Sequence, residues 1–273
     1  MGAYDHTFAV LAYRESPYLE ECLLSLLRQT VRSRIFIATS TPSLFLERVA
    51  EKHGLPLEVN KERGGIASDW TFAYRNCRTK YATLAHQDDI YLPGYAEQCL
   101  DAAYKCRDSL IFFTGYAELL AGKIIDSSRN LAMKKCVLSF FYPFGNNAAS
   151  PWRKRLMLSF GNPIACPSVM FDRERIGPFE FSGDFSYNLD WEAWSRLAAR
   201  EGGFTYVKEK LMLHRIHGGS ELVKGSSGRR RCEEDSALFA LFWPKPLAGA
   251  ISKAYVRLSY GPYLKGGMDG APK

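Results

Sequence analysis

The chain has 273 residues, of which 47% are hydrophobic and 14% aromatic, and it carries a formal net charge of +7 at pH 7. This composition excludes a disordered chain and supplies a large core, and the length suits one domain with an appendage. The positive charge favours an anionic ligand, such as a nucleotide, an anionic lipid surface or a nucleic acid.

Strand and helix patterns alternate over the first 105 residues. Short apolar runs predict strands over residues 8–13, 34–38, 55–59 and 81–85. We expect Ser16 to cap the first helix and Pro93 to open the fourth. Because the connecting loops are short, the alternation indicates a parallel sheet joined by right-handed crossovers. Apolar residues at helical spacing predict the four helices over residues 18–27, 44–53, 66–76 and 93–105.

Several classes of protein are disfavoured by what the sequence lacks. No Gly-x-Gly-x-x-Gly follows the first predicted strand and no Walker loop is present, which argues against Rossmann dinucleotide-binding domains and P-loop phosphotransferases. Seven cysteines without CxxC spacing argue against a disulfide framework or a structural zinc site. Without an apolar leader or a bilayer-spanning apolar stretch, we expect a cytoplasmic protein, soluble or peripheral to a membrane.

After residue 108 the pattern becomes irregular. The tail, residues 229–260, is expected to be helical with a break at 243–246, after a flexible joint at 225–228. Because the tail mixes cations with aromatic residues, it could lie on anionic lipid, but we favour a helix packed on the core. Before the tail we predict a strand over 109–113, a hairpin over 116–125, helices over 131–141, 152–160 and 188–199, and strands over 204–207 and 211–214.

An acidic pair follows the predicted strand at residues 81–85. Asp88 and Asp89 repel each other unless a cation lies beside them, and hard oxygen ligands suit Mg²⁺ or Mn²⁺, which would in turn hold phosphate oxygens. The alternative is an Asp-Asp turn that caps the next helix. We favour the metal site because open α/β sheets bind ligands at the carboxyl ends of their strands.

Two further polar groups are candidates for the same site. Asp190 lies near a helix start and, taken alone, is best explained as an N-cap. Its alternative role is a general base, desolvated by Trp191 and Trp194 beside it, with Glu192 as the weaker candidate. His217 follows the last predicted strand and, with Asp89, would make a mixed oxygen and nitrogen site acceptable to Mn²⁺, whereas His214 is interpreted as a strand residue.

Taken together, the chain resembles family 2 glycosyltransferases of the GT-A fold, in the bacterial branch that builds surface polysaccharides. The resemblance implies an α/β fold with a mostly parallel nucleotide-binding sheet flanked by helices and a C-terminal helical extension. It divides the chain into a glycosyltransferase domain (1–224), with a nucleotide-sugar-binding half (1–107) and an acceptor and catalytic half (108–224), and an extension (225–273). The matching blocks follow the order of the family, at residues 8–30, 64–66, 87–93, 189–196 and 214–220.

The resemblance also implies a role for each candidate residue. Asp88, Asp89 and His217 would hold Mn²⁺ or Mg²⁺ on the diphosphate of a nucleotide sugar. Asp190, six residues before an arginine, would be the catalytic base of an inverting reaction. The residues implied to bind the nucleotide sugar are Ala12, Tyr13, Glu15, Ser40, Gly65, Ile66, Asp69, Trp70, Gln87 and Asp88.

Two positions depart from the pattern of the family. The loop after the second strand reads Thr-Ser-Thr at residues 39–41, where the family usually carries an aspartate that reads the base. The preference for UDP over another nucleotide is therefore open. His86 stands where the longer acidic motif often has its first aspartate, which predicts weaker metal binding than is typical.

The implied reaction moves a sugar from a nucleoside-diphosphate sugar, a UDP-sugar first among them, to a hydroxyl of a saccharide or lipid-linked saccharide. The implied setting is capsule, lipopolysaccharide or exopolysaccharide synthesis, with a possible peripheral contact at the inner face of the plasma membrane. A nucleotidyltransferase is disfavoured because its glycine-rich, Arg/Lys-bearing loop is absent. A nucleic-acid-binding protein is disfavoured because the cations form separate clusters while carboxylates occupy the predicted site, so we expect no nucleic-acid partner.

Overall fold

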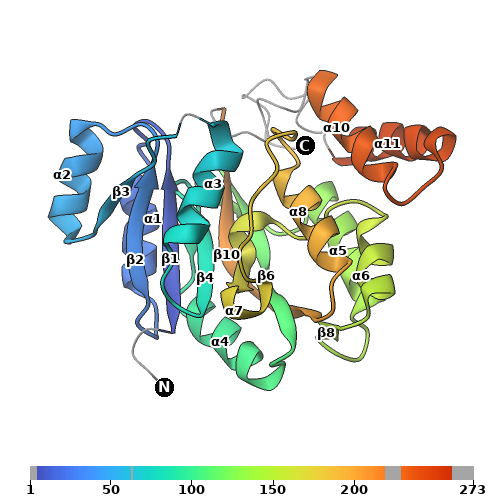
Figure 1. Ribbon diagram of the computed structural model, residues 1–273, viewed down its shortest axis with the longest axis horizontal. Helices are drawn as coiled ribbons and strands as arrows, with labels where there is room; N and C mark the ends of the chain where they lie inside the picture. Colours follow the sequence, from blue (N-terminus) through green and yellow to red (C-terminus); the bar gives the residue numbers. More distant parts are fainter. Residues whose placement is uncertain (1–4, 63, 219–228, 260–273) are drawn as a thin grey trace.

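The computed structural model describes residues 5–62, 64–218 and 229–259. In this part of the chain ten strands form a mixed sheet with helices on both faces (Figure 1). The main strands, in spatial order, are β3 (Leu57–Val59), β2 (Arg34–Thr39), β1 (His6–Ala12), β4 (Tyr81–His86), β9 (Val169–Asp172), β6 (Ser109–Leu120), β10 (Gly203–Ile216) and β5 (Ile90–Tyr91). Two short strands extend the sheet, β7 (Lys123–Ile125) beside β6 and β8 (Asn147–Ala148) beside β10.

The sheet is parallel in two sections, which β9 joins. Strands β3, β2, β1 and β4 run parallel, as the alternation of the sequence predicts, so their carboxyl ends lie along one edge. Strands β6 and β10 are also parallel to each other. Between the two sections, β9 pairs antiparallel with both β4 and β6. The predicted hairpin at residues 116–125 is confirmed by the antiparallel pairing of β6 with β7.

Two hydrophobic cores lie on opposite faces of the sheet. Successive residues of β1 point to alternate faces, so that Phe8 and Val10 join one core while Ala9 joins the other. The first core lies under α1 (Leu19–Leu27), α2 (Leu44–His53) and α4 (Tyr95–Lys105). The second lies under α3 (Gly65–Asn76), α5 (Arg129–Phe141), α6 (Pro151–Leu158) and α8 (Leu189–Ala198), with the short α7 (Arg173–Ile176) at its edge.

The C-terminal helices α10 (Arg229–Phe239) and α11 (Lys245–Ser259) belong to the second core. Leu238, Phe239, Ala248 and Tyr255 are buried there, which confirms the packed arrangement that we favoured for the tail. The flexible joint expected at 225–228 lies outside the described residues. Among the described helices, none is both long and apolar enough to cross a membrane.

Two predicted helix starts are wrong. Pro93 does not open α4, which begins at Tyr95, because the Leu92 N–H donates to the carbonyl of Leu211 at 2.9 Å and keeps this segment extended beside β10. Ser16 does not cap α1, which begins at Leu19. Its hydroxyl instead accepts a hydrogen bond from the N–H of the second residue along, at 3.3 Å, in the turn before the helix.

The two strands predicted over 204–207 and 211–214 form one strand, β10. The apolar pattern is interrupted because the pairing register with β6 shifts between Val207 and Lys210, where the side chains are exposed. Gly115 of β6 allows this bulge to approach, since a Cβ there would lie 3.0 Å from the carbonyl oxygens of Lys208 and Glu209. A local interruption of the pattern is therefore a bulge rather than a strand end.

Gly202 makes the turn from α8 into β10. Its φ of +106° is a conformation that favours glycine, and an added Cβ would lie 2.8 Å from the carbonyl oxygen of Asp108. We therefore expect Gly202→Ala to lower the free energy of unfolding by about 1–3 kcal/mol, as measured by urea denaturation. Gly145→Ala is the control, because a Cβ at Gly145 meets no atom within 4 Å. Equal stability of the two variants would contradict this account of the turn.

Candidate functional site

The carboxyl ends of the parallel strands bring the predicted nucleotide-binding loops together. The Tyr13 N–H donates to Oε1 of Gln87 at 3.2 Å, and Nε2 of Gln87 donates to the Tyr13 carbonyl at 3.0 Å. The loops after β1 and β4 are thus joined by a reciprocal amide pair. In the same loop, Ala12 ends β1 in a buried position, whereas Glu15 is exposed.

The loop after β2 is joined to α3 through a carboxylate. The Ser40 hydroxyl donates to Oδ2 of Asp69 at 2.8 Å, and Nδ2 of Asn60 donates to Oδ1 of the same residue at 2.9 Å. The loop itself carries no aspartate, yet an aspartate of α3 lies against it. Residues 40 and 69, which the sequence places in separate loops, therefore share one hydrogen-bonded group.

The start of α3 places a tryptophan beside the acidic motif. Gly65 begins the helix with a φ of +74°, and Ile66 follows it. Trp70, one turn on, is buried and lies against the His86 ring at a centroid distance of 5.2 Å. The Trp70 ring therefore covers one side of the turn after β4.

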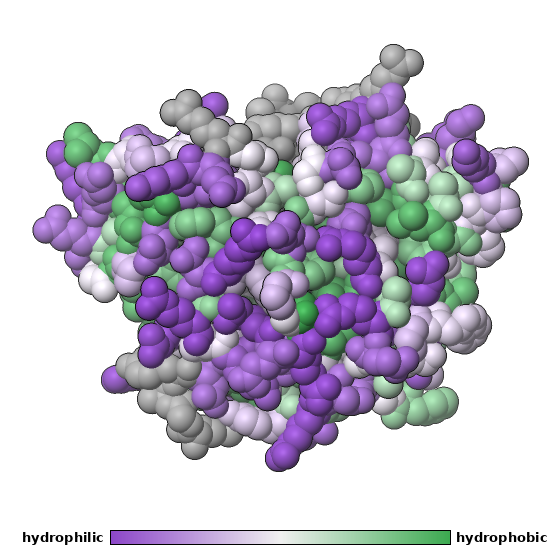
Figure 2. All heavy atoms as spheres, viewed as in Figure 1, coloured by the Kyte–Doolittle hydropathy of each residue, from purple (hydrophilic) through white to green (hydrophobic). Residues whose placement is uncertain are grey.

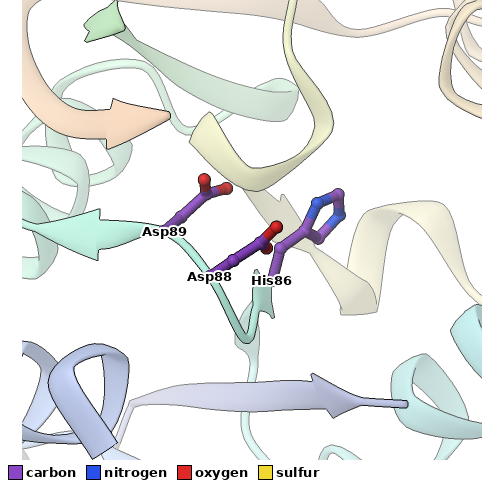
Figure 3. A group of neighbouring side chains, drawn as sticks. All are labelled: His86, Asp88 and Asp89. Atoms are coloured by element: carbon purple, nitrogen blue, oxygen red, sulfur yellow. The ribbon is translucent and has the colours of Figure 1, made fainter. Parts of the chain in front are cut away.

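His86, Asp88 and Asp89 form a compact group at the end of β4. One ligand atom from each lies within 4.8 Å of the others, and the three side chains leave the turn on the same side, with Asp88 in the middle (Figure 3). The Asp89 N–H donates to the His86 carbonyl at 3.2 Å and closes the turn. The two aspartates that the sequence suggests as metal ligands are thereby joined by His86, which stands where the family often has an aspartate.

The end of β10 holds this turn. The Asp89 side chain is fully buried, and its Oδ1 accepts a hydrogen bond from the Arg215 N–H at 2.9 Å and lies 3.0 Å from Nδ1 of His214. The Arg215 side chain donates through Nε to the Asp88 carbonyl at 2.8 Å. His217 lies further along, with Nε2 2.9 Å from Oδ2 of Asp88. The acidic turn is thus clamped by the strand that ends beside it.

Burial and the neighbouring charges together set the pKa values of the side chains in and around this group. Burial alone would raise the pKa of Asp89, but the neighbouring His214 lowers it below its ordinary value. Burial alone would lower the pKa of His214, but the charge and hydrogen bond of Asp89 raise it to about 8. Burial lowers the pKa of His86 in spite of both aspartates, so its imidazole is neutral at neutral pH.

The group fits a divalent cation. Oδ2 of Asp89 and Nε2 of His86 are buried without a hydrogen-bond partner among the described residues. A buried polar atom without a partner is costly, and an ion would satisfy both. Two carboxylates and a neutral imidazole are donors that Mn²⁺ accepts, and Mg²⁺ accepts the oxygens.

Asp190 lies on α8, near the same group. It is the second residue of that helix and not its N-cap, which is Asn188, so the capping interpretation is wrong. Burial raises the pKa of Asp190, while the Lys134 ammonium opposes the shift. Burial is the main cause of the lowered pKa of His86 and of the raised pKa of Tyr116, but the charge of Asp190 also acts on both groups, which indicates that its carboxylate is near the turn after β4.

Sequence reasoning missed four residues around the site. His214 and Arg215 had a visible signal, since cationic residues gather at the end of the last predicted strand, opposite in charge to the acidic pair. Lys134 and Tyr116 had none. They come from α5 and β6, and Nζ of Lys134 donates to the Tyr116 hydroxyl at 2.9 Å. Only the folded chain brings that cation to the proposed base.

Comparison with known proteins agrees with this geometry. A profile described as glycosyl transferase family 2 matches residues 7–155, more than half of the chain. Over 241 residues the chain is 24% identical to an uncharacterized glycosyltransferase of Rickettsia typhi, a match that covers 85% of this chain and 70% of the relative.

Solved structures share the fold at low sequence identity. S. aureus TarS in complex with UDP-GlcNAc has a TM-score of 0.62 at 11% identity, over 94% of this chain and 73% of that chain. The mannosyltransferase PcManGT of Pyrobaculum calidifontis, in complex with GDP-Man and Mn²⁺, has a TM-score of 0.63 at 16% identity, over 95% of this chain and 72% of that chain. The GT-A fold inferred from the sequence is therefore confirmed. With the matching profile, these findings establish that the chain belongs to glycosyl transferase family 2.

Proposed function

We propose that the protein is an inverting glycosyltransferase that moves a sugar from a nucleoside-diphosphate sugar to a hydroxyl of its acceptor. The observation that carries the proposal is Asp190, a carboxylate of raised pKa near the turn that holds His86 and the two aspartates. A base of raised pKa accepts a proton more readily than an ordinary carboxylate does. Family membership favours this reaction over nucleotidyl transfer and over nucleic-acid binding.

The proposed reaction is a single in-line displacement. The acceptor oxygen forms a bond to the anomeric carbon while the bond from that carbon to the diphosphate oxygen breaks. Asp190 takes the proton of the acceptor hydroxyl, and the nucleoside diphosphate leaves with the bonding electrons. Because the attack comes from the face opposite the leaving group, the configuration at the anomeric carbon inverts.

We further propose that the first half of the chain, residues 1–107, binds the donor and that residues 108–224 bind the acceptor. Tyr13, Ser40, Asp69 and Gln87 belong to the joined loops on the donor side. His86, Asp88 and Asp89 would hold a Mn²⁺ or Mg²⁺ ion, with His217 beside them. When bound, the ion would supply positive charge against the diphosphate oxygens.

The solved structures of similar fold support a general class of donor. TarS was solved with UDP-GlcNAc, and PcManGT with GDP-Man and Mn²⁺. These complexes support a nucleoside-diphosphate sugar as the donor and a divalent ion as the cofactor. We propose a UDP-sugar first, with GDP-sugars as the alternative.

For the acceptor we propose a saccharide or lipid-linked saccharide of a bacterial surface polysaccharide, met at the inner face of the plasma membrane. A patch of exposed hydrophobic side chains supports a membrane contact. The patch consists of Phe140, Phe144, Trp152, Phe160 and Leu241, each between 49% and 101% exposed. Figure 2 shows hydrophobic side chains on the right-hand part of the molecule in this view, where Figure 1 places α5, α6 and α11.

The chemistry of this patch suits anionic lipid. The Phe160 ring lies 6.4 Å from that of Trp243 and 6.3 Å from that of Phe141, so the turn after α10 and the ends of α5 and α6 adjoin. Arg155 is exposed on α6, and its guanidinium lies 5.4 Å from the centroid of the Phe242 ring. Aromatic rings beside cations are typical of surfaces that lie on anionic membranes.

The seven cysteines are free thiols, which suits a reducing cytoplasm.

The donor and the ion are tested together by thermal unfolding. We expect one nucleotide-sugar family, among UDP-, GDP- and dTDP-sugars, to stabilise the protein by about 2–4 kcal/mol at concentrations well above its dissociation constant. The shift should require Mn²⁺ or Mg²⁺ and vanish with EDTA and in Asp88→Asn. Asp108→Asn, an exposed aspartate away from the group, is the control. A full shift in EDTA would refute metal-dependent donor binding.

The base is tested by kinetics and product analysis. We expect Asp190→Asn to lower kcat by about 10²–10⁴-fold with little change in the KM for the donor, because only proton transfer is lost. Glu192→Gln is the matched control, since Glu192 pairs with Nε of Arg196 at 2.6 Å. NMR of the wild-type product should show an inverted anomeric configuration. A retained configuration, or loss of activity in Glu192→Gln alone, would refute the assignment.

The membrane contact is tested with lipid vesicles. We expect the protein to sediment with vesicles that contain phosphatidylglycerol and less with phosphatidylcholine alone, because exposed cations add to the aromatic contact. Phe144→Ala combined with Trp152→Ala should weaken sedimentation, while Leu44→Ala, also exposed but on α2, should not. Equal sedimentation of all variants would rule out this patch as the contact surface.

A further inference from the structure

The N-terminal end of α8 is capped by a residue of another helix. The N-cap residue Asn188 makes no capping hydrogen bond with its own side chain. Instead, the Glu234 carboxylate of α10 accepts hydrogen bonds from three successive backbone N–H groups, those of Ser186 at 2.7 Å, Tyr187 at 2.9 Å and Asn188 at 3.1 Å. These groups precede and open the helix that carries Asp190.

The cap is buried and charged. Glu234 is only 6% exposed, and the adjacent Asp235 is fully buried and accepts a hydrogen bond from Nδ2 of Asn188 at 2.9 Å. Hydrogen bonds from backbone N–H groups to a carboxylate are charge-assisted and stronger than neutral ones. An anion at a helix N-terminus is also favoured by the helix dipole. Together these contacts fix the tip of α8 against α10, and Figure 1 places α10 beside the upper end of α8.

The C-terminal helices hold α8 at two more points. The Trp191 ring lies 4.8 Å from that of Phe239 on α10 and 5.7 Å from that of Tyr255 on α11. The Tyr255 hydroxyl accepts a hydrogen bond from the Asn162 N–H at 3.5 Å. Burial raises the pKa of Asp190 and the Asn162 side chain in turn lowers it, which places that side chain near the carboxylate. The extension therefore reaches the proposed base from its helix and through a neighbour.

We propose that Glu234 is a positioning residue for Asp190, so that the C-terminal extension forms part of the catalytic apparatus of the transferase. This inference rests on the proposed role of Asp190 as the base. Asp190 lies two residues beyond the last N–H that Glu234 binds, so the placement of that end of α8 sets the placement of the carboxylate. Misplacement of a catalytic group by about 1 Å can cost on the order of 10²-fold in rate.

Hydrogen exchange tests whether Glu234 holds the start of α8, and it needs no substrate. We expect Glu234→Gln to speed exchange of the amide hydrogens of residues 186–190, because an amide side chain has one acceptor oxygen instead of two and no charge. Glu233→Gln is the matched control, because Glu233 is the exposed neighbour on α10. Unchanged exchange in Glu234→Gln would overturn the proposal.

A double-mutant cycle tests the link to the base. The rate measured is release of nucleoside diphosphate from UDP-GlcNAc or GDP-mannose, whichever the thermal assay selects. We expect Glu234→Gln to lower kcat by about 10–10²-fold with the KM for the donor unchanged, and to cost little more when Asp190→Asn is already present. Leu46→Ala is the control for a general loss of stability, because Leu46 is a buried residue of α2 in the first core, on the other face of the sheet.

Failure of the proposed base and failure of the positioning role would give different results. If Asp190→Asn keeps full activity, the proposed base is wrong whatever Glu234 does. If Asp190→Asn is impaired but Glu234→Gln lowers kcat equally in both backgrounds, or not at all, only the positioning role is overturned.

Discussion

The buried carboxylate of Asp89 is the contact on which the site depends. A charge without exposure is costly unless it is paired, and here the Arg215 N–H and His214 provide the partners. These partners lie about half the chain away, at the end of β10. The interaction therefore fixes the turn after β4 against a distant strand. Asp88 and His86 owe their place in the group to that fixed turn.

The arrangement of the sheet explains how two halves of one chain make one site. The parallel section β3-β2-β1-β4 presents its loops along one edge, and β9 then connects it to the section formed by β6 and β10. α8 packs on this continuous sheet through the second core, which also contains residues of β4 and α3 on the proposed donor side. The bulge that lies against Gly115 of β6 belongs to β10, the strand that carries His214 and Arg215 near its end.

The C-terminal extension is integrated with this arrangement. Its aromatic residues complete the second core, and its buried carboxylates bind the backbone where α8 begins. A tail that only covered hydrophobic surface would not require two buried acidic side chains. Their cost is offset by the backbone N–H groups and the amide that they accept from.

The sequence by itself determined the order of the main strands and helices in the first 105 residues and the acidic turn. Apolar periodicity is a property of neighbouring residues, so it indicated the alternation of strand and helix, the first parallel section and the position of Asp88 and Asp89 at a strand end. Contacts between distant residues leave no periodic pattern, and the cations at the end of the last predicted strand indicate charge but not which residues meet. Four contacts join residues far apart in sequence. They are the pairing of β5 with β10, which moves the start of α4 past Pro93, the hydrogen bond of Ser40 to Asp69, the hydrogen bonds to Asp89, and the cap of α8 by Glu234. Only the tertiary structure decided these, because each depends on which elements pack together.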